Sequence, residues 1–437
     1  MRRTAVAGSP ALTSMSNKAL HQYLHHYAEP ETRWLANWPS DCHYRQVLVI
    51  PAYREEATFI EQALTARWFT AEVLLIVVLN QPHSDTDQTP QRTLFEAIRS
   101  RTRLHWKAGP LYLLTAQDTH LQTRTDNGHI LLVDRFQQPL PARQGVGLAR
   151  KIGADLALAL QAAGQLHSDW IATTDADARL PDDYFGAMAE LPPEATAACY
   201  PFTHIGGEAA VAQATAQYEQ ALRYYVAGLQ YAGSPYAYHS IGSTLLFRAS
   251  AYAQVRGFPK RAAGEDFHLL NKLAKLGHVV SLTATPIQLQ ARISDRVPFG
   301  TGMSTARIMN LNQHGEAFCY YHPQSFAVLR QVLTHFGCLW AQRNQFGDWL
   351  AALPAVAQSA LQRAGLPDFV TAQARQCRTQ AQFDAQVMRW FDALKTLQFI
   401  HRLRDLAYPD VPLQDSLQVL PTGGNTLSQT QSFGRIL

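Results

Sequence analysis

Residues 170–177 read WIATTDAD, an apolar segment that runs directly into two aspartates, Asp175 and Asp177. The apolar and β-branched residues predict a buried strand, so both carboxylates stand at the strand's carboxyl end. Carboxylates one residue apart suit a hard divalent cation such as Mg²⁺ or Mn²⁺, which can bridge a diphosphate. An isolated Asp-x-Asp fits a turn or a helix cap equally well, and Asp182 and Asp183 lie nearby. Its position after a strand favours the metal interpretation.

Strands and helices alternate on both sides of this segment. Residues 47–50 (VLVI) predict a buried strand that Pro51 ends, and residues 74–79 predict a second one. Further strands are predicted at 111–115 and 130–133, and helices at 55–66, at 145–163 and after Pro181. This alternation is typical of an α/β fold with a Rossmann-like, mostly parallel sheet, which binds ligands at the carboxyl ends of its strands.

The length of 437 residues exceeds what one core usually holds, so we expect more than one domain. β signals fade beyond about residue 320, whereas residues 361–406 carry apolar residues at helical spacing. The predicted organisation is an N-terminal arm (1–43), a large nucleotide-binding α/β domain (44–318), a helical C-terminal module (319–411) and a loose tail (412–437).

Two further motifs have acidic residues at the predicted end of a strand or start of a helix. Residues 49–56 (VIPAYREE) end a strand, and there Tyr53 could stack on a nucleoside while Glu55 binds sugar hydroxyls. Residues 264–270 (GEDFHLL) open a helix, and Asp266 could serve as a general base that deprotonates an acceptor hydroxyl. Acidic residues at a helix start also satisfy the helix dipole, so a purely structural role stays open for both motifs.

In this order, PAYREE, DAD and GEDFHLL resemble the motifs of the family 2 glycosyltransferases, which have the GT-A fold. The resemblance extends over about residues 45–300 and includes residues 242–248 (GSTLLFR). It implies a hexosyltransferase-like enzyme that transfers sugar, with inversion, from a nucleotide-sugar donor to a hydroxyl acceptor. The resemblance implies that Pro51, Tyr53, Glu55 and Asp175 bind the donor, that Asp175 and Asp177 bind a Mn²⁺ or Mg²⁺ ion, and that Asp266 is the base.

The chain departs from the family pattern after the second strand, where an acidic pair is usual. Residues 79–82 read LNQP, which leaves Asn80 as the candidate nucleoside contact. The segment 94–141 is also longer than a compact core of this family requires.

Basic residues near glycines suggest further donor contacts. Residues 143–151 (RQGVGLARK) resemble the family's basic helix start and offer Arg143 and Arg150 to the phosphates. This is no dinucleotide fingerprint, because Arg150 stands where a third glycine is needed. Arg292 and Arg296 precede a glycine-containing turn and fit either a lid over the diphosphate or a surface loop with solvated arginines.

Composition limits the partners. The net charge is +4 and the basic residues are scattered, which gives no reason to expect nucleic-acid binding. The longest apolar run, residues 73–79, is far shorter than the roughly 20 residues of a membrane span, so only surface contact with a lipid-linked acceptor stays open. Five cysteines without a CxxC pair favour a reducing, cytoplasmic location. Of the histidines, His314 and His322 are placed where a third metal ligand could come.

Two other functions remain as alternatives. A sugar nucleotidyltransferase would share the sheet and the metal carboxylates, but it needs a glycine-rich loop after the first strand, where this chain has residues 51–53 (PAY). A catalytically silent GT-A-like scaffold would not need Asp175, Asp177 and Asp266, all of which are present. Glycosyl transfer is the function that the sequence favours.

Overall fold

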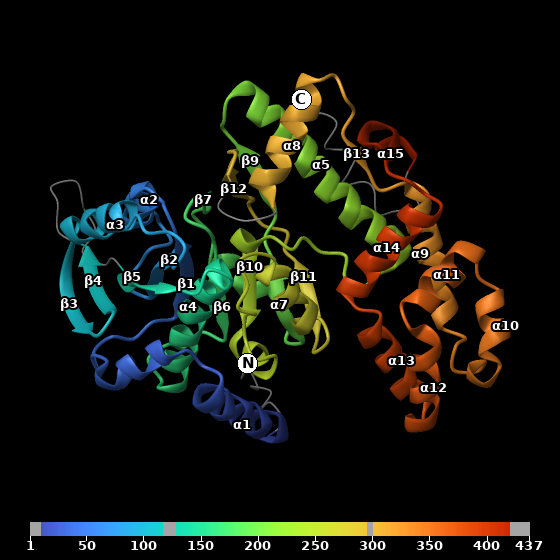
Figure 1. Cartoon of the computed structure of the whole chain (residues 1–437). Helices are drawn as coiled ribbons and strands as arrows, with labels where there is room; N and C mark the ends of the chain where they lie inside the picture. Colours follow the sequence, from blue (N-terminus) through green and yellow to red (C-terminus); the bar gives the residue numbers. More distant parts are fainter. Residues whose placement is uncertain (1–9, 117–127, 295–299, 420–437) are drawn as a thin grey trace, which may run out of the picture. The chain divides into compact units, whose positions relative to one another are not determined.

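The structure is a computed structural model that describes residues 10–116, 128–294 and 300–419. The chain forms two compact units, shown with their elements in Figure 1. We call Met1–Glu208 with Ser240–Met303 the sheet unit, and Ala209–His239 with Ser304–Leu437 the helical unit. Among the described residues, no helix has both the length and the hydropathy that crossing a bilayer requires.

A sheet of nine strands forms the centre of the sheet unit. Its spatial order is β11 (His278–Ser281), β8 (Ala195–Cys199), β10 (Leu245–Arg248), β6 (Trp170–Thr173), β1 (Gln46–Ala52), β2 (Val73–Pro82), β5 (His129–Leu140), β4 (Leu111–Ala116) and β3 (Thr102–Ala108). β4 and β10 run opposite to the other strands, so the sheet is mixed but mostly parallel. This arrangement confirms the predicted α/β class.

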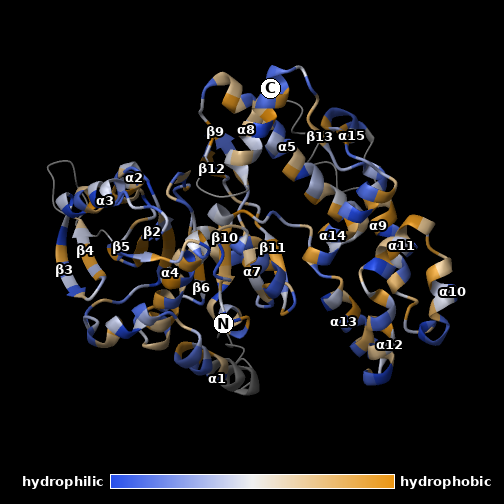
Figure 2. Cartoon of the chain, viewed as in Figure 1, coloured by the Kyte–Doolittle hydropathy of each residue, from blue (hydrophilic) through white to orange (hydrophobic). Residues whose placement is uncertain are grey.

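The middle of the sheet is formed by the apolar runs that the sequence marks as strands. β1 lies between β2 and β6 and is parallel to both, with Leu48 opposite Leu75 on one side and Ala172 on the other. Their side chains are fully buried, and the hydrophobic colouring of these strands can be followed in Figure 2. Because the three strands are parallel, their carboxyl ends meet at one edge of the sheet.

Helices and a small second sheet complete the sheet unit. The helical elements are α1 (Pro10–His26), η1 (Pro30–Asn37), α2 (Thr58–Thr65), α3 (Thr89–Ser100), α4 (Gly145–Ala162), η2 (Gly186–Glu190), η3 (Gly242–Thr244), α6 (Ala249–Gln254) and α7 (Glu265–Leu273). The small sheet has the order β7 (Ala178–Arg179), β12 (Ile287–Gln290), β9 (Phe202–Ile205). α4 packs directly on β1, and Gly153 permits this closeness because a Cβ there would overlap Val49.

The N-terminal segment is part of the sheet unit, which differs from the predicted separate arm of residues 1–43. The Tyr23 hydroxyl of α1 donates to Asp155 Oδ1 at 2.5 Å, and Lys151 Nζ donates to Asp155 Oδ2 at 2.7 Å. All three side chains are buried, and Tyr252 Oη adds a further hydrogen bond to Asp155. This buried ionic network attaches α1 to α4, whose second turn carries Arg150 of the predicted donor site.

The helical unit is formed by helices that pack around an apolar core. They are α5 (Ala209–Ala232), α8 (Thr301–Gln313, which begins in the sheet unit), α9 (Pro323–Phe336), η4 (Arg343–Gln345), α10 (Phe346–Ala351), α11 (Ala355–Arg363), α12 (Leu366–Gln376), α13 (Gln380–Trp390), α14 (Ala393–Leu406) and α15 (Leu413–Val419), with the short strands β13 (Cys319–Tyr320) and β14 (Val411–Pro412). Tyr224 of α5 packs on Phe326 of α9 with ring centroids 5.5 Å apart. Three of the six tyrosines of residues 218–238 belong to this packing, namely Tyr224, Tyr225 and Tyr231.

Three sequence predictions differ from the structure. The units divide at residues 303 and 304 rather than at 318, and α5 joins the C-terminal helices because its apolar face is buried against α9. Pro181 opens a turn followed by the short 3₁₀ helix η2, not an α-helix. The predicted loose tail begins with α15, while residues 420–437 lie outside the described part. The long segment 94–141 supplies most of α3 and all of β3, β4 and β5.

The buried network around Asp155 gives a stability prediction. Lys151→Met removes the cation and leaves the Asp155 carboxylate buried without its charge partner, which costs about 3–5 kcal/mol of unfolding free energy. The measurement is the first transition in urea denaturation. The control is Arg45→Ala, since Arg45 and Glu72 form a pair whose side chains are 73% and 61% exposed. That control should change stability by no more than about 0.5 kcal/mol; equal effects of the two variants would contradict the prediction.

Candidate active site

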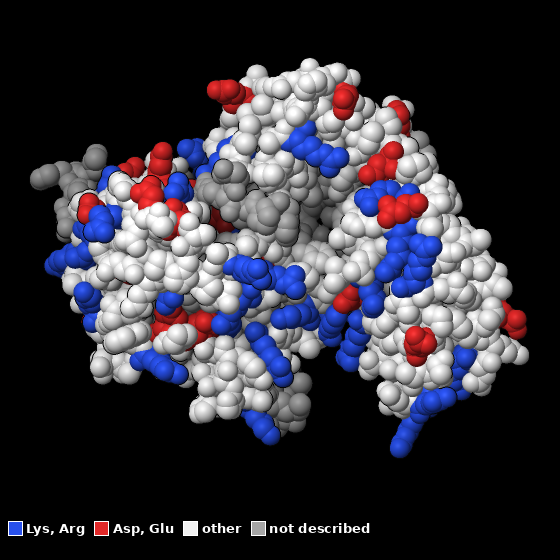
Figure 3. Space-filling model, in the orientation of Figure 1, with Lys and Arg blue, Asp and Glu red and all other residues white. Residues whose placement is uncertain are grey.

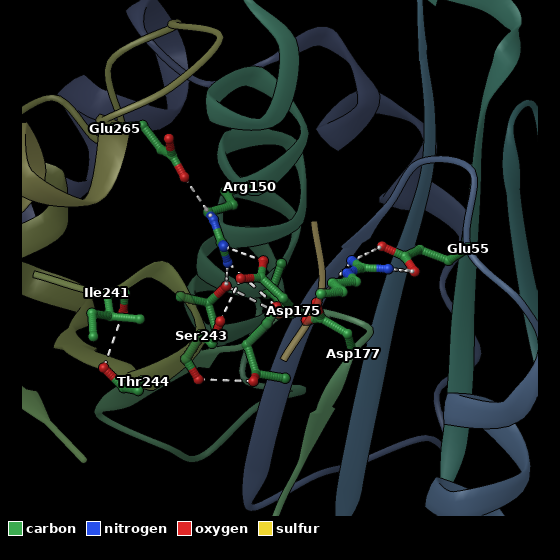
Figure 4. A network of polar contacts seen from close by, with 12 residues as sticks. Glu55, Arg150, Asp175, Asp177, Ile241, Ser243, Thr244 and Glu265 are labelled. Atoms are coloured by element: carbon green, nitrogen blue, oxygen red, sulfur yellow. Dashed lines mark hydrogen bonds and ion pairs between the residues drawn. The ribbon is translucent and has the colours of Figure 1, made fainter. Parts of the chain in front are cut away.

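The carboxyl ends of β1 and β6 bring the two acidic motifs together. The Thr174 amide, just past β6, donates to the Val49 carbonyl of β1 at 3.1 Å, and Thr173 Oγ1 bonds the same carbonyl at 3.0 Å. These bonds fix the residues from which Asp175 and Asp177 extend. Figure 4 shows Asp175 and Asp177 close together, with the Glu55 side chain extending towards Asp177.

A buried arginine organises the first aspartate. The Arg150 side chain is only 2% exposed, and its Nε donates to Glu265 Oε1 at 2.9 Å while Nη2 pairs with Asp175 Oδ1. Its Nη1 also donates to Thr173 Oγ1 at 2.6 Å. Figure 4 shows Arg150 reaching from α4 with Glu265 on one side and Asp175 on the other. Burial acts to lower the pKa of Arg150, but Asp175 and Glu265 outweigh it and the net direction is upward, so the group stays charged.

The other oxygen of Asp175 is bound as well, because the Ser243 hydroxyl donates to Oδ2. Ser243 belongs to η3, whose Gly242 lies against Arg150 so closely that a Cβ would overlap the guanidinium. Asp175 is therefore fixed through both oxygens, by α4 on one side and by η3 on the other.

The second aspartate pairs with a different arginine. Arg292 Nη2 lies 2.7 Å from Asp177 Oδ2 and 3.1 Å from Glu55 Oε1. The guanidinium thus joins the segment after β12 to the ends of β1 and β6. The side chain of Arg292 is 35% exposed and that of Asp177 is 23% exposed, so solvent reaches this pair more than it reaches Arg150.

Asp266 lies at the first turn of α7, next to Glu265 in the chain. Gly264 precedes the helix in the left-handed region (φ 70°), a conformation that a residue with a Cβ adopts at a cost. Burial, and next the charge of Glu265, raise the pKa of Asp266 to about 7. Its chain neighbour Glu265 pairs with Arg150, and Arg150 also pairs with Asp175, so Asp266 lies one residue from a chain of ion pairs that reaches the aspartate after β6. The ion pairs of Arg150 and Arg292 thus bring residues of all three acidic motifs together.

One acidic residue of the site was missed from the sequence. Asp85, three residues beyond β2, accepts from Tyr53 Oη at 2.7 Å and from Arg54 Nε at 2.9 Å. The hydrogen bond from Arg54 is the main reason that the pKa of Asp85 falls to about 2. Arg54 has a positive φ of 54°, unusual for a residue with a Cβ, at the turn between Tyr53 and Glu55. The signal available in the sequence was the acidic run SDTD at residues 84–87.

The remaining predicted donor residues are placed differently. Pro51 is buried within β1, and Asn80 is 4% exposed within β2, where its Oδ1 has no hydrogen-bond partner among the described residues. Arg143 is exposed just before α4, and Arg296 lies outside the described residues.

The glycines at the start of α4 approach protein backbone. The Gly147 amide donates to the Arg261 carbonyl at 2.9 Å, and a Cβ at Gly147 would meet that loop. The space beside Gly147 is thus occupied by the backbone of residues 259–261. His314 and His322 belong to the helical unit, where His322 Nδ1 accepts from the Gln324 amide at the start of α9.

Residues 170–343 match a family model described as Glycosyl transferase family group 2. This part of the chain therefore resembles the family 2 glycosyltransferases. The matched part of this glycosyltransferase contains Asp175, Asp177, Ser243, Glu265, Asp266 and Arg292, and the motif at residues 51–56 lies before it. With the sheet described above, the match confirms the predicted GT-A fold class and the assignment as an enzyme that transfers sugar.

Solved structures similar to this glycosyltransferase are distant. S. aureus TarS residues 1–349, in complex with UDP-GlcNAc, is 13% identical with a TM-score of 0.37, and the alignment covers 79% of this chain and 89% of that one. The mannosyltransferase PcManGT from Pyrobaculum calidifontis, in complex with GDP-Man and Mn²⁺, is 18% identical with a TM-score of 0.33, covering 91% and 98%. No curated protein matches the sequence.

The contact between Gly242 and Arg150 yields a prediction for this glycosyltransferase. Gly242→Ala adds a methyl group that displaces the guanidinium and with it Asp175, so we expect sugar transfer to fall at least about tenfold, given that misplacements of about 1 Å can cost 100-fold. Gly186→Ala is the matched control, since a Cβ there meets nothing within 4 Å. Initial rates and melting temperatures would be measured for both; a fully active Gly242→Ala enzyme would show that Arg150 need not be held in this position.

Proposed function

We propose that this glycosyltransferase transfers a sugar with inversion from a nucleotide-sugar donor to a hydroxyl acceptor, using a divalent cation and Asp266 as the base. The observation that carries the proposal is the set of ion pairs at the carboxyl edge of the sheet. Arg150 connects Asp175 to Glu265, the neighbour of Asp266, and Arg292 connects Asp177 to Glu55. Direct displacement needs charge neutralisation on the leaving diphosphate and proton removal from the attacking hydroxyl. These carboxylates can serve both needs.

The carboxylates suit a cation of the Mg²⁺ or Mn²⁺ class. Asp177 is a better placed ligand than Asp175, because the side chain of its ion-pair partner, Arg292, is 35% exposed. The Asp177 side chain is also partly exposed. Asp175 already uses both oxygens, although each carboxylate oxygen has a second lone pair to offer. When bound, the cation would neutralise charge on the diphosphate. We assign Asp177 to direct coordination and Asp175 to a ligand position held by Arg150 and Ser243.

Asp266 is the group that can accept the acceptor's proton. Its pKa of about 7 suits a base that works near neutral pH, since the ideal catalytic pKa lies near the operating pH. The neighbouring Glu265 is 4% exposed and is paired with Arg150, so it has a structural task instead. Of the two acidic residues at the start of α7, Asp266 is therefore assigned as the base.

The donor is proposed to bind along the ends of β1 and β2. Tyr53 and Glu55 stand at the end of β1, and Asp85, already bonded to Tyr53, supplies the acidic group that the sequence lacked directly after β2. Arg292 would move from the two carboxylates to the donor's diphosphate when the cation takes its place. Arg143 stays a candidate phosphate contact, whereas Arg150 is assigned to positioning because its guanidinium is buried between carboxylates.

Partners and location follow from composition and surface. Lys and Arg gather over the middle of the face drawn in Figure 3, but the net charge of the chain is only +4. This small net charge supports the expectation that nucleic acid is not a ligand. All five cysteines are free thiols, which supports the proposed cytoplasmic location. A sugar nucleotidyltransferase is disfavoured because β1 leads into buried Pro51 and Ala52 rather than a glycine-rich phosphate loop.

Two substitutions separate cation binding from proton removal. Asp177→Ala should abolish Mn²⁺-dependent binding of the donor, whereas Asp266→Asn should keep donor binding and lose transfer by at least about 100-fold. Binding is measured calorimetrically with a panel of UDP- and GDP-sugars, with and without Mn²⁺, and transfer by slow donor hydrolysis. The control is Asp182→Ala, whose side chain is 65% exposed. Normal transfer by Asp266→Asn would remove the assignment of the base.

The raised pKa of Asp266 predicts how the rate depends on pH. The active form is the unprotonated carboxylate, so kcat/KM should fall about tenfold per pH unit below the pKa and level off above about 7. A bound cation nearby favours the carboxylate and shifts the inflection to lower pH. The residual rate of Asp266→Asn should lack this inflection. A wild-type profile that rises towards acidic pH would contradict the assignment.

A further inference from the structure

A second group of metal-binding side chains lies outside the proposed active site. Asp41, Cys42 and His105 each direct one possible ligand atom into a space where all three atoms lie within 4.8 Å of one another. Asp41 and Cys42 belong to the segment between η1 and β1, and His105 belongs to β3. β3 is the last strand at one edge of the nine-stranded sheet, so the group joins the N-terminal segment to that edge.

The spacing of the ligand atoms fits one tetrahedral ion. Cys42 Sγ lies 3.5 Å from His105 Nε2 and 3.9 Å from Asp41 Oδ1. With bonds of about 2.3 Å from zinc to sulfur and about 2.0 Å from zinc to nitrogen or oxygen, ligands at tetrahedral angles stand about 3.5 Å apart. The sulfur-to-nitrogen separation equals this value, and the sulfur-to-oxygen separation needs only a small side-chain rotation. A weak S–H···N hydrogen bond is the competing explanation for the same distance.

The backbone around the group is held in place by the fold. The Trp38 ring packs edge-on against Trp106 of β3 with centroids 5.3 Å apart, and Trp38 Nε1 donates to the Cys42 carbonyl at 3.3 Å. On the other side, the Tyr44 amide donates to the Gln165 carbonyl at 2.9 Å. His105 itself is the extra residue of a β-bulge between Leu104 and Trp106, a device that re-aims a side chain.

Two buried polar atoms beside the group have no hydrogen-bond partner among the described residues. One is Tyr44 Oη, on a side chain only 1% exposed. The other is Nδ1 of His129, whose ring centroid lies 5.4 Å from that of His105. Unpaired polar atoms are costly in a buried place, and a bound ion with its water offers them a partner.

We propose that Asp41, Cys42 and His105 bind a divalent metal ion of the zinc class, which fastens the N-terminal segment to the edge strand β3. A thiolate with an imidazole selects such an ion over Mg²⁺ or Mn²⁺, which prefer oxygen ligands. Binding converts the Cys42 thiol to a thiolate and releases its proton to solvent. Water would take the fourth position. The exposed positions of Asp41 and His105 give the ion a route to the buried sulfur.

The test uses Co²⁺ as a spectroscopic substitute for zinc in the full chain after treatment with a chelator. We expect one equivalent of Co²⁺ to produce a near-ultraviolet thiolate-to-cobalt band and the visible bands of a tetrahedral ion, and zinc to displace both. Cys42→Ser should abolish the charge-transfer band, and His105→Gln should weaken binding. Cys319→Ser is the matched control, since this exposed thiol belongs to the helical unit.

Two further variants separate this site from other metal-binding residues. Asp177→Asn should keep the cobalt band, because Asp177 belongs to the proposed active site, and His26→Ala should keep it because His25 and His26 form a separate exposed pair on α1. Zinc should also raise the melting temperature of the wild type and leave that of Cys42→Ser unchanged. Absence of the thiolate band in the wild type, or its persistence in Cys42→Ser, would overturn the proposal and leave only the S–H···N hydrogen bond.

Discussion

The edge of the sheet that carries the candidate active site depends on one buried charge. The Arg150 side chain is almost completely buried. The charge of a buried guanidinium must be neutralised by other groups of the protein. Glu265 and Asp175 provide that neutralisation from two distant parts of the chain, so the demand of a single cation draws the start of α7 and the end of β6 to α4. Asp266 comes to the site as the neighbour of Glu265. The position of the proposed base is thus a result of electrostatic pairing in the core.

The second arginine of the site is in a different situation. Arg292 pairs with Asp177 and Glu55 at a partly exposed place, where an ion pair is worth little and can exchange its partners at low cost. The two arginines therefore divide the work between them. Arg150 holds the Asp175 carboxylate in a fixed geometry. Arg292 pairs with the carboxylates of Asp177 and Glu55, to which a metal ion could bind in its place. Binding of a cation with a diphosphate would exchange ionic contacts without adding net charge to the site.

Sequence alone predicted the features that are local or repeated along the chain. The apolar runs of β1, β2 and β6 are continuous, so their burial could be inferred, and the aspartates that end β6 followed from that. The role of Arg150 could not be predicted, because its burial results from contacts with residues far away in the chain. Asp85 escaped notice since it follows β2 by three residues, and only the tertiary structure brings it to Tyr53. The partnership of α5 with α9 is equally long-range.

The membership of α5 in the helical unit has a consequence for how the chain can be divided. α5 is encoded between the two parts of the sheet unit, yet its apolar face is covered by helices that follow Met303. During synthesis this apolar face stays uncovered until α9 has emerged from the ribosome. A chain cut after Met303 would keep the residues of the catalytic edge but carry an uncovered hydrophobic helix in its middle. The catalytic half cannot be separated from the C-terminal helices without a risk of aggregation.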